Sequence, residues 1–267
     1  MTIDVAVERS PNVLWQDRAL QWAIATLVVA QATVVGLQVI GRHIFRQPIP
    51  WTEEIARLLL VWLMCIGGVS ALRHSQHPRV TALLRVLPDV RRAAVERGLQ
   101  LVLLAFFLSL VVPAWHLTTA SATEVLPASG LSGATISGVL PVALLLMSAV
   151  VVQQLRRDGL DAWQDRTSLV WSLGAAGLSI ASVLVPLVAG AAPLTVLVVG
   201  FLITAALGVP LAFTLALTSL TYLVGIGGVS LIILPIKILG GVDSFVLLAI
   251  PLFIVAGVLM LLKLFSG

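Results

Sequence analysis

The feature that most constrains this sequence is a series of long apolar runs separated by short polar segments. Five of these runs have about 20 residues each, which at 1.5 Å per residue matches the roughly 30 Å apolar core of a bilayer. They cover residues 22–40, 55–72, 99–117, 134–155 and 169–189. This pattern is typical of a helical protein that crosses the membrane several times.

The composition excludes a water-soluble fold. Of the 267 residues 59% are apolar and 10% are charged, whereas about a quarter of the residues in a soluble domain are charged. The net charge of +4 does not indicate nucleic-acid binding, because the basic residues lie in short segments beside apolar runs. We expect an all-α polytopic membrane protein whose main partner is the lipid bilayer.

The distribution of Lys and Arg predicts the orientation. Cytoplasmic segments of membrane proteins are enriched in these residues, and a cytoplasmic N-terminus places eleven of them inside and three outside. The eleven are Arg9, Arg18, Arg73, Arg79, Arg85, Arg91, Arg92, Arg97, Arg156, Arg157 and Arg166. The three are Arg42, Arg46 and Arg57. Apolar residues alternate with the arginines of 73–97 at helical spacing, so part of this segment is expected as an amphipathic helix facing anionic headgroups.

The second half begins with a polar linker at 156–166 and is otherwise apolar. Its run at 194–224 has 31 residues, about 46 Å as one helix, which exceeds the bilayer core. We expect this helix either to tilt strongly or to break at Gly208-Val209-Pro210. Two further apolar segments follow at 225–241 and 242–264.

Polar side chains within or beside the spans are the candidate contact residues. Gln31 and Gln38 are seven residues apart, so they share a helix face, which we expect to point at protein. Trp51 is a candidate interfacial anchor at the start of the second span, where Thr52 is expected to cap the helix. Glu53 and Glu54 lie four and three residues before Arg57, so either carboxylate can pair with it.

Other polar residues support weaker hypotheses. Asp243 and Ser244 follow two glycines and can cap the last helix, with a part in an ion pathway as the alternative. The four histidines, His43, His74, His77 and His116, lie near span ends, so we expect no haem, metal or other tightly bound cofactor. No catalytic triad, phosphate-binding loop or zinc motif is present in the sequence, so no enzyme is indicated.

The first half resembles the small Q-type membrane subunit of the tripartite ATP-independent periplasmic (TRAP) transporters. The Trp-x-Glu-Glu-x-x-Arg motif at 51–57 has prolines before it and a histidine after it, and this combination is fairly specific. The matching residues are Arg42, Phe45, Pro48, Pro50, Trp51, Glu53, Glu54, Ala56, Arg57, Ala71, His77, Arg79, Val80, Leu87, Pro88 and 141–147.

The second half is similar to the start of the large M-type subunit of the same family. The order and spacing of three segments carry this resemblance, namely 208–213, 240–245 and 249–257. A four-span Q-type part that begins inside also ends inside, whereas the M-type subunit is expected to begin outside. One extra crossing is therefore needed, and the run at 169–189 supplies it.

The resemblance implies a division of the chain into three parts. Residues 1–155 form a four-span Q-like bundle, residues 156–192 a charged linker with a connecting span, and residues 193–267 the first two or three helices of an elevator-type transport domain. The candidate contacts between domains or subunits are Gln31, Gln38, Trp51, Glu53, Glu54 and Arg57.

The resemblance also implies a function. Members of the family are sodium-driven secondary transporters of the bacterial inner membrane that take carboxylate-bearing solutes from a periplasmic solute-binding protein. The chain ends early in its M-like part, so we expect the substrate and sodium sites to lie in the remainder of the M-type subunit, and Ser129–Ala134 is not assigned as a site. The alternatives are a helical membrane enzyme or electron-transfer subunit that uses the histidines, and a structural membrane adaptor.

Overall fold

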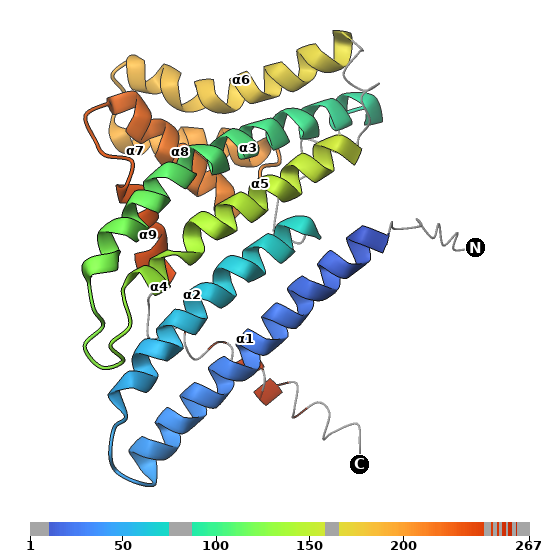
Figure 1. Ribbon diagram of the computed structural model, residues 1–267. Helices are drawn as coiled ribbons and strands as arrows, with labels where there is room; N and C mark the ends of the chain where they lie inside the picture. The colour runs from blue at the N-terminus through green and yellow to red at the C-terminus, as the bar shows by residue number, and fades with distance from the viewer. Residues whose placement is uncertain are drawn as a thin grey trace. The chain divides into compact units, whose positions relative to one another are not determined.

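All secondary-structure elements in the residues that the structure describes are helices (Figure 1). The computed structural model describes residues 11–74, 87–157 and 166–242, together with 247, 250, 253–254, 256–257 and 260. Within these residues five helices are long and apolar enough to cross a membrane, one for each of the five predicted runs. The prediction of an all-α polytopic membrane protein is confirmed.

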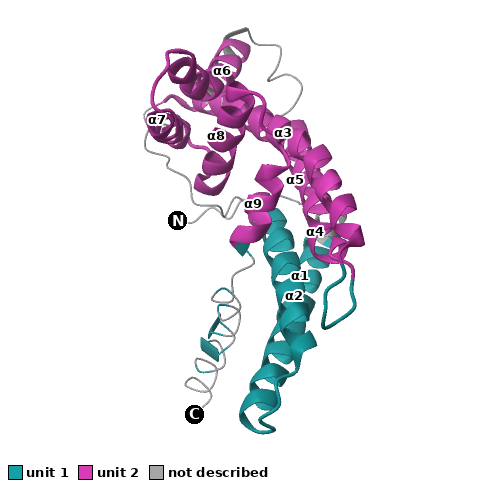
Figure 2. Ribbon diagram, turned by 90° about the vertical axis from the view of Figure 1, so that its left-hand side faces the viewer, with its two compact units in different colours: residues 1–70, 125–131, 242–267 teal, residues 71–124, 132–241 magenta. Residues whose placement is uncertain are grey.

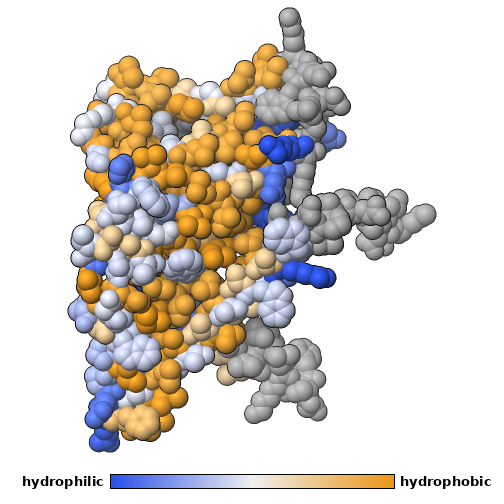
Figure 3. Space-filling model, viewed as in Figure 1, coloured by the Kyte–Doolittle hydropathy of each residue, from blue (hydrophilic) through white to orange (hydrophobic). Residues whose placement is uncertain are grey.

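Apolar side chains cover much of the surface. On the face shown in Figure 3 hydrophobic residues predominate, and large apolar side chains such as Trp22, Val188 and Leu194 are mostly exposed. Contiguous apolar surface of this extent is matched to lipid rather than to water. The exposed side chains and the composition therefore both indicate a protein that lies in a membrane.

The chain forms two compact units (Figure 2). The first consists of Met1–Ser70, Val125–Leu131 and Val242–Gly267, and the second of Ala71–Glu124 and Ser132–Gly241. The boundaries predicted at 155/156 and 192/193 stay predictions.

The first unit is built on a hairpin of α1 (Pro11–His43) and α2 (Pro50–Arg73). The connection folds back on the end of α1, where the Gln47 N–H donates to the carbonyl O of Gly41 at 3.1 Å. A Cβ at Gly41 would lie 3.0 Å from Ile49 Cδ1, so a glycine permits this tight return. The core of the hairpin comprises Val35, Ala56 and Leu60, with Val34, Val242 and Leu247 packed against them.

The second unit is arranged around α3 (Asp89–Ala120), which packs against α5 (Val139–Arg157) and α6 (Arg166–Val188). Two short helices, η2 (Ser121–Thr123) and α4 (Ala134–Ser137), join α3 to α5. Phe107 and Leu110 of α3 are fully buried. Part of 73–97 was expected as an amphipathic surface helix, but Arg91, Arg92 and Arg97 lie in the first turns of the long α3. Residues 75–86 of that segment lie outside the described residues.

The run at 194–224 is broken rather than tilted. It forms α7 (Pro193–Ala206) and α8 (Leu211–Ile226), and Gly208 between them has a φ of 98°, which only glycine adopts without strain. The two helices pack on each other and on α6. With 14 and 16 residues they are about 21 and 24 Å long, shorter than the bilayer core. A third short helix, α9 (Ile233–Val242), follows.

Buried threonines occur along the broken pair. Thr204 of α7 and Thr214 and Thr218 of α8 are almost completely buried. Each hydroxyl donates to a carbonyl O in its own helix or at the helix start, on Gly200, Pro210 and Thr214 respectively. Hydroxyls satisfied in this way can be buried in an apolar surrounding without leaving an unpaired polar group.

Candidate functional site

The polar cluster predicted from the sequence lies in the first turns of α2, and this helix begins about one turn earlier than expected. The helix starts at Pro50, whose fixed φ suits the first position of a helix. Thr52 is already inside the helix, and its hydroxyl donates to the Ile49 carbonyl O at 2.6 Å. The expected capping role of Thr52 is therefore wrong, because the hydroxyl satisfies a carbonyl rather than a free helix N–H.

Glu53 and Glu54 are adjacent in sequence but have different partners. The Arg57 Nη2 donates to Glu53 Oε1 at 2.7 Å, and both side chains are about 40% exposed. An ion pair this exposed contributes little to stability. Its effect is to keep the guanidinium and the carboxylate along the surface of α2, one turn apart.

Glu54 instead holds a segment far away in the sequence. Its Oε2 accepts hydrogen bonds from the Ser129 N–H at 2.7 Å and from the Ser129 hydroxyl at 2.6 Å. Its Oε1 accepts one from the Ala128 N–H at 3.0 Å. The carboxylate thus joins the start of α2 to the loop at 125–131, and we call this arrangement the Glu54 clamp.

The loop has the shape that the clamp requires. The Gly130 N–H donates to the Leu126 carbonyl O at 2.9 Å, and the Leu126 N–H donates to the Leu131 carbonyl O at 2.8 Å. Gly130 has a φ of 71°, so a glycine turns the chain there. These two backbone hydrogen bonds close the loop on itself. The N–H groups of Ala128 and Ser129 are not used in them and donate to the Glu54 carboxylate.

The clamp is suited to positioning rather than to catalysis. A carboxylate that accepts three hydrogen bonds is a strong acceptor for backbone N–H groups, and all three donors here belong to Ala128 and Ser129 of one loop. Trp51, beside the clamp on α2, is 43% exposed, as an interfacial anchor would be. Sequence reasoning found Glu54 but missed Ser129, whose only signal was a Ser-Gly pair in the loop between two spans.

The glutamines of α1 occupy the expected face. Gln31 is completely buried, and neither atom of its amide has a hydrogen-bond partner within the described residues. Gln38, two turns further on, is half-buried. An unpaired amide in an apolar surrounding is unfavourable, and the role of both residues as contacts stays a prediction.

Of the other candidates, some lie outside the described residues. Asp243 and Ser244 lie outside the described residues, as does His77. The imidazole of His43 is within 3.1 Å of the Val39 carbonyl O in its own helix. In the part of the chain that the structure describes, no group of three or more potential metal-binding side chains occurs.

The structure also shows a helix junction that sequence reasoning missed. Gly98 of α3 lies so close to α6 that a Cβ on it would collide with the backbone of Ser172. Further along α6, a Cβ on Gly200 of α7 would lie 2.5 Å from Val183 Cγ2. Small residues allow close helix approach within membranes, so α6 packs tightly on α3 and on α7.

Comparison with protein families assigns the two ends of the chain separately. The model of the DctQ component of the tripartite ATP-independent periplasmic transporters matches residues 31–159. The model of the DctM component of the same transporters matches residues 198–263. Helix α6 lies between the two matched ranges.

Individual relatives agree with this assignment. A Haemophilus influenzae protein named as a TRAP transporter small permease is 27% identical over 139 residues, which are 52% of this chain and 86% of the relative. The sialic acid TRAP transporter small permease protein of Vibrio cholerae is 27% identical over 131 residues, 49% of this chain and 74% of the relative.

One relative matches both parts of the chain. The sialic acid TRAP transporter permease protein of Haemophilus influenzae is 23% identical over 251 residues, which are 90% of this chain. The match covers 41% of that relative, so the chain spans less than half of its length.

Proposed function

We propose that this chain is the supporting portion of a sodium-coupled carboxylate transporter. The premise is that the chain belongs to the membrane components of the TRAP transporters and joins a Q-type part to an M-type part. Both matched families are permease components of transporters and not enzymes. In this proposal the Q-type part and α6 form a fixed support in the inner membrane. The moving part of the M-type subunit works against that support.

The packing of α6 carries the proposal. Within the second unit α6 packs on α3, which lies in the Q-type range, and on α7 and α8, most of whose residues lie in the M-type range. Two glycines make these approaches close, Gly98 on α3 and Gly200 on α7. A helix packed closely on two neighbours is suited to a static joint, because interlocked helices resist sliding.

The substrate class is proposed from the relatives. Two of them are named for sialic acid, a sugar acid that carries a carboxylate. In this chain the buried polar groups of α7 and α8 are threonine hydroxyls that bond to backbone carbonyls, and they offer no charge to a carboxylate. We therefore propose that the substrate and sodium sites lie in M-type residues other than those of α7 and α8.

The orientation is proposed from the basic residues. A cytoplasmic N-terminus places the Glu54 clamp and the loop at 125–131 on the periplasmic side, since both adjoin outer ends of spans in that topology. There the clamp keeps a loop in one shape where a periplasmic solute-binding protein would approach. A loop that is already ordered loses less conformational entropy when a partner binds.

Uptake into proteoliposomes tests the proposal. The chain is reconstituted with the remainder of an M-type subunit and with a periplasmic solute-binding protein of the TRAP family, and radiolabelled sialic acid and dicarboxylates are supplied outside. We expect uptake that requires the binding protein and an inward sodium gradient. The 267-residue chain alone should give no uptake.

Two results would contradict this function. Sodium-driven uptake by the chain alone would place the transport sites within it. Uptake by the completed transporter that is indifferent to sodium would exclude the proposed coupling ion.

A further inference from the structure

Charged side chains gather in the first turns of α3, close to the start of α6. Three arginines there carry positive charge and two carboxylates oppose it, which leaves the group net positive. The arginines are Arg91, Arg92 and Arg97, and the carboxylates are Asp89 and Glu96.

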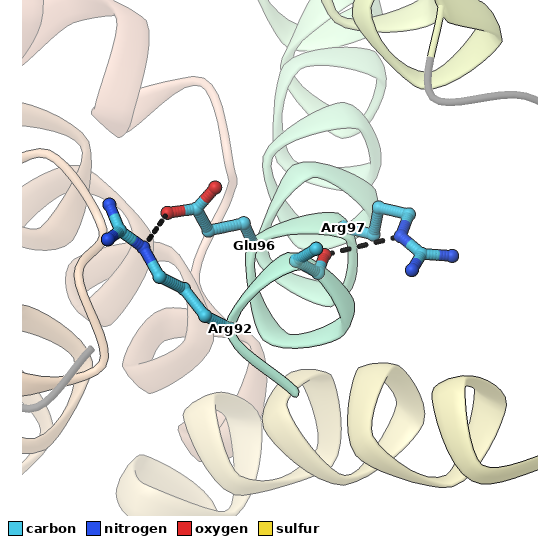
Figure 4. Close-up of polar contacts among 4 residues, drawn as sticks. Arg92, Glu96 and Arg97 are labelled. Carbon is cyan, nitrogen blue, oxygen red and sulfur yellow. Dashed lines mark hydrogen bonds and ion pairs between the residues drawn. The ribbon is translucent and has the colours of Figure 1, made fainter. Parts of the chain in front are cut away.

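Two of the three arginines are engaged within α3. Arg92 Nε donates to Glu96 Oε1 at 3.2 Å, and Arg97 Nε donates to the Ala93 carbonyl O at 3.2 Å. Arg97 is only 6% exposed. Figure 4 shows Arg92 and Glu96 on one side of the helix and Arg97 on the other. Neither of these arginines is well placed to bind a further anion.

Arg91 differs from both. It is exposed, and its guanidinium carbon lies 5.3 Å from the centre of the Trp171 ring of α6. This is within the range of a cation–π contact, which restrains the guanidinium without using its N–H donors. Within the described residues no hydrogen-bond acceptor or carboxylate is paired with the Arg91 side chain, so in this part of the chain its donors are available to a ligand.

The pair is held in place by the helix junction. Arg91 lies two turns before Gly98 on α3, hence on the same face, and Trp171 is next to Ser172 on α6. The close approach of Gly98 to Ser172 therefore brings the guanidinium over the ring. An arginine fixed in this way is preorganised, which lowers the entropic cost of binding a ligand.

The surroundings identify the kind of ligand. Val170 and Leu173 flank Trp171 on α6 and are 69% and 64% exposed. The candidate span of this helix begins at Leu169, so Trp171 lies at the depth of the lipid headgroups. A ligand that bears a phosphate and also an acyl chain can contact the guanidinium and the apolar flank together, whereas a soluble anion would leave the flank unused.

We propose that Arg91 and Trp171 form a binding site for an anionic phospholipid at the α3–α6 junction. The phosphate accepts hydrogen bonds from the Arg91 guanidinium, and an acyl chain lies against Val170 and Leu173. Charge complementarity selects an anionic headgroup, because the net positive charge of this end of α3 has no equivalent attraction for a zwitterion. This inference does not depend on the transported solute.

Native mass spectrometry of the full chain tests the site. The protein is released from nanodiscs that contain equal amounts of phosphatidylglycerol and phosphatidylcholine, and the bound lipids are counted. We expect about tenfold more retained phosphatidylglycerol than phosphatidylcholine, as a charge-assisted contact of this kind provides. Arg91→Gln should reduce the ratio to about twofold or less.

Control variants separate the site from general charge. Arg42→Gln makes the same change in charge in the last turn of α1, where Arg42 is exposed, and should leave the ratio unchanged. Trp171→Leu keeps the charge and should lower the ratio severalfold, because the guanidinium loses its support. If Arg91→Gln unfolds the protein, Arg91→Lys replaces it and should show an intermediate ratio, because a point charge lacks the planar donors.

Three outcomes would overturn the proposal. Equal retention of the two lipids by the unmodified protein would exclude selection of an anion. Equal losses in Arg91→Gln and Arg42→Gln would show that only the total charge matters. Displacement of phosphatidylglycerol by millimolar inorganic phosphate would assign the site to a soluble anion instead of a lipid.

Discussion

The carboxylate of Glu54 accepts hydrogen bonds from both the backbone N–H and the hydroxyl of Ser129, at 2.7 and 2.6 Å, across 75 residues of sequence. The contact joins the first turn of a span to a loop between two other spans. Because its neighbour Glu53 is paired with Arg57, the two adjacent carboxylates have separate tasks. One supports a loop and the other orders the surface of its own helix.

Replacing Glu54 should release the loop at 125–131. In Glu54→Gln the side chain loses its charge and one acceptor oxygen, so it can no longer accept all three hydrogen bonds. We expect amide hydrogen exchange at Ala128 and Ser129 to accelerate by about tenfold, since local opening sets that rate. The matched control is Glu53→Gln, which breaks only the pair with Arg57. Equal exchange rates in the two variants would contradict the clamp.

Ser129→Ala should have a smaller effect at the same loop. It removes the hydroxyl donor but keeps the backbone N–H groups of Ala128 and Ser129 that bond to Glu54. We expect amide exchange in 125–131 to accelerate by about threefold, less than in Glu54→Gln. A change as large as that of Glu54→Gln would show that the hydroxyl, rather than the backbone, holds the loop.

A methyl group at Gly98 should separate α3 from α6. The new Cβ would collide with the backbone at Ser172, and backbone atoms cannot move aside as a side-chain tip can. We expect Gly98→Ala to reduce the free energy of unfolding in detergent by about 1–3 kcal/mol, as overpacking does. Thermal unfolding followed by tryptophan fluorescence measures the change.

The control for that variant lies on α6 itself. A Cβ at Gly174 would meet no atom within 4 Å, and alanine favours the helix over glycine. Gly174→Ala should therefore be neutral or stabilising by up to about 1 kcal/mol. If both variants lose stability equally, the Gly98 contact is not what makes the junction close.

The packing of α7 on α6 can be tested with a double-mutant cycle. A Cβ at Gly200 would lie 2.5 Å from Val183 Cγ2, so Gly200→Ala should destabilise the protein by about 1–2 kcal/mol. Val183→Ala removes the colliding methyl group, and the double variant should recover part of the loss. Strict additivity of the two single changes, measured by the same thermal unfolding, would show that the residues are not in contact.

Replacing Gln31 should raise the stability of the protein, whereas the glycine replacements should lower it. Its amide is fully buried without a hydrogen-bond partner in the described residues, so Gln31→Leu removes unpaired polar atoms at little change in volume. We expect the isolated chain to gain about 1–3 kcal/mol in stability. The half-buried Gln38 should change less when replaced by Leu. A loss of stability in Gln31→Leu would show that the amide is satisfied in solution.

Sequence patterns predicted the five spans. They left the sixth apolar run either tilted or broken at Gly208-Val209-Pro210, and the structure shows the break. Each depends on a property that a short stretch carries by itself: about 20 apolar residues for a span, and a Gly-Val-Pro segment for a break. The TRAP resemblance was found in the same way, from motifs such as Trp-x-Glu-Glu-x-x-Arg, and both family models match the chain. The start of α2 was misplaced because Thr52, a good capping residue, lies just inside a helix that Pro50 had already begun.

By itself the sequence determined the class of fold, the number of long spans and the family. It also indicated that Glu53 or Glu54 could pair with Arg57, because both spacings place the side chains on one helix face. Only the tertiary structure decided that Glu53 takes Arg57 and Glu54 takes Ser129, and that Gly98 meets Ser172 and Arg91 meets Trp171. The physical reason is that helix periodicity shows which residues share a face, whereas the neighbour of that face depends on how distant helices pack.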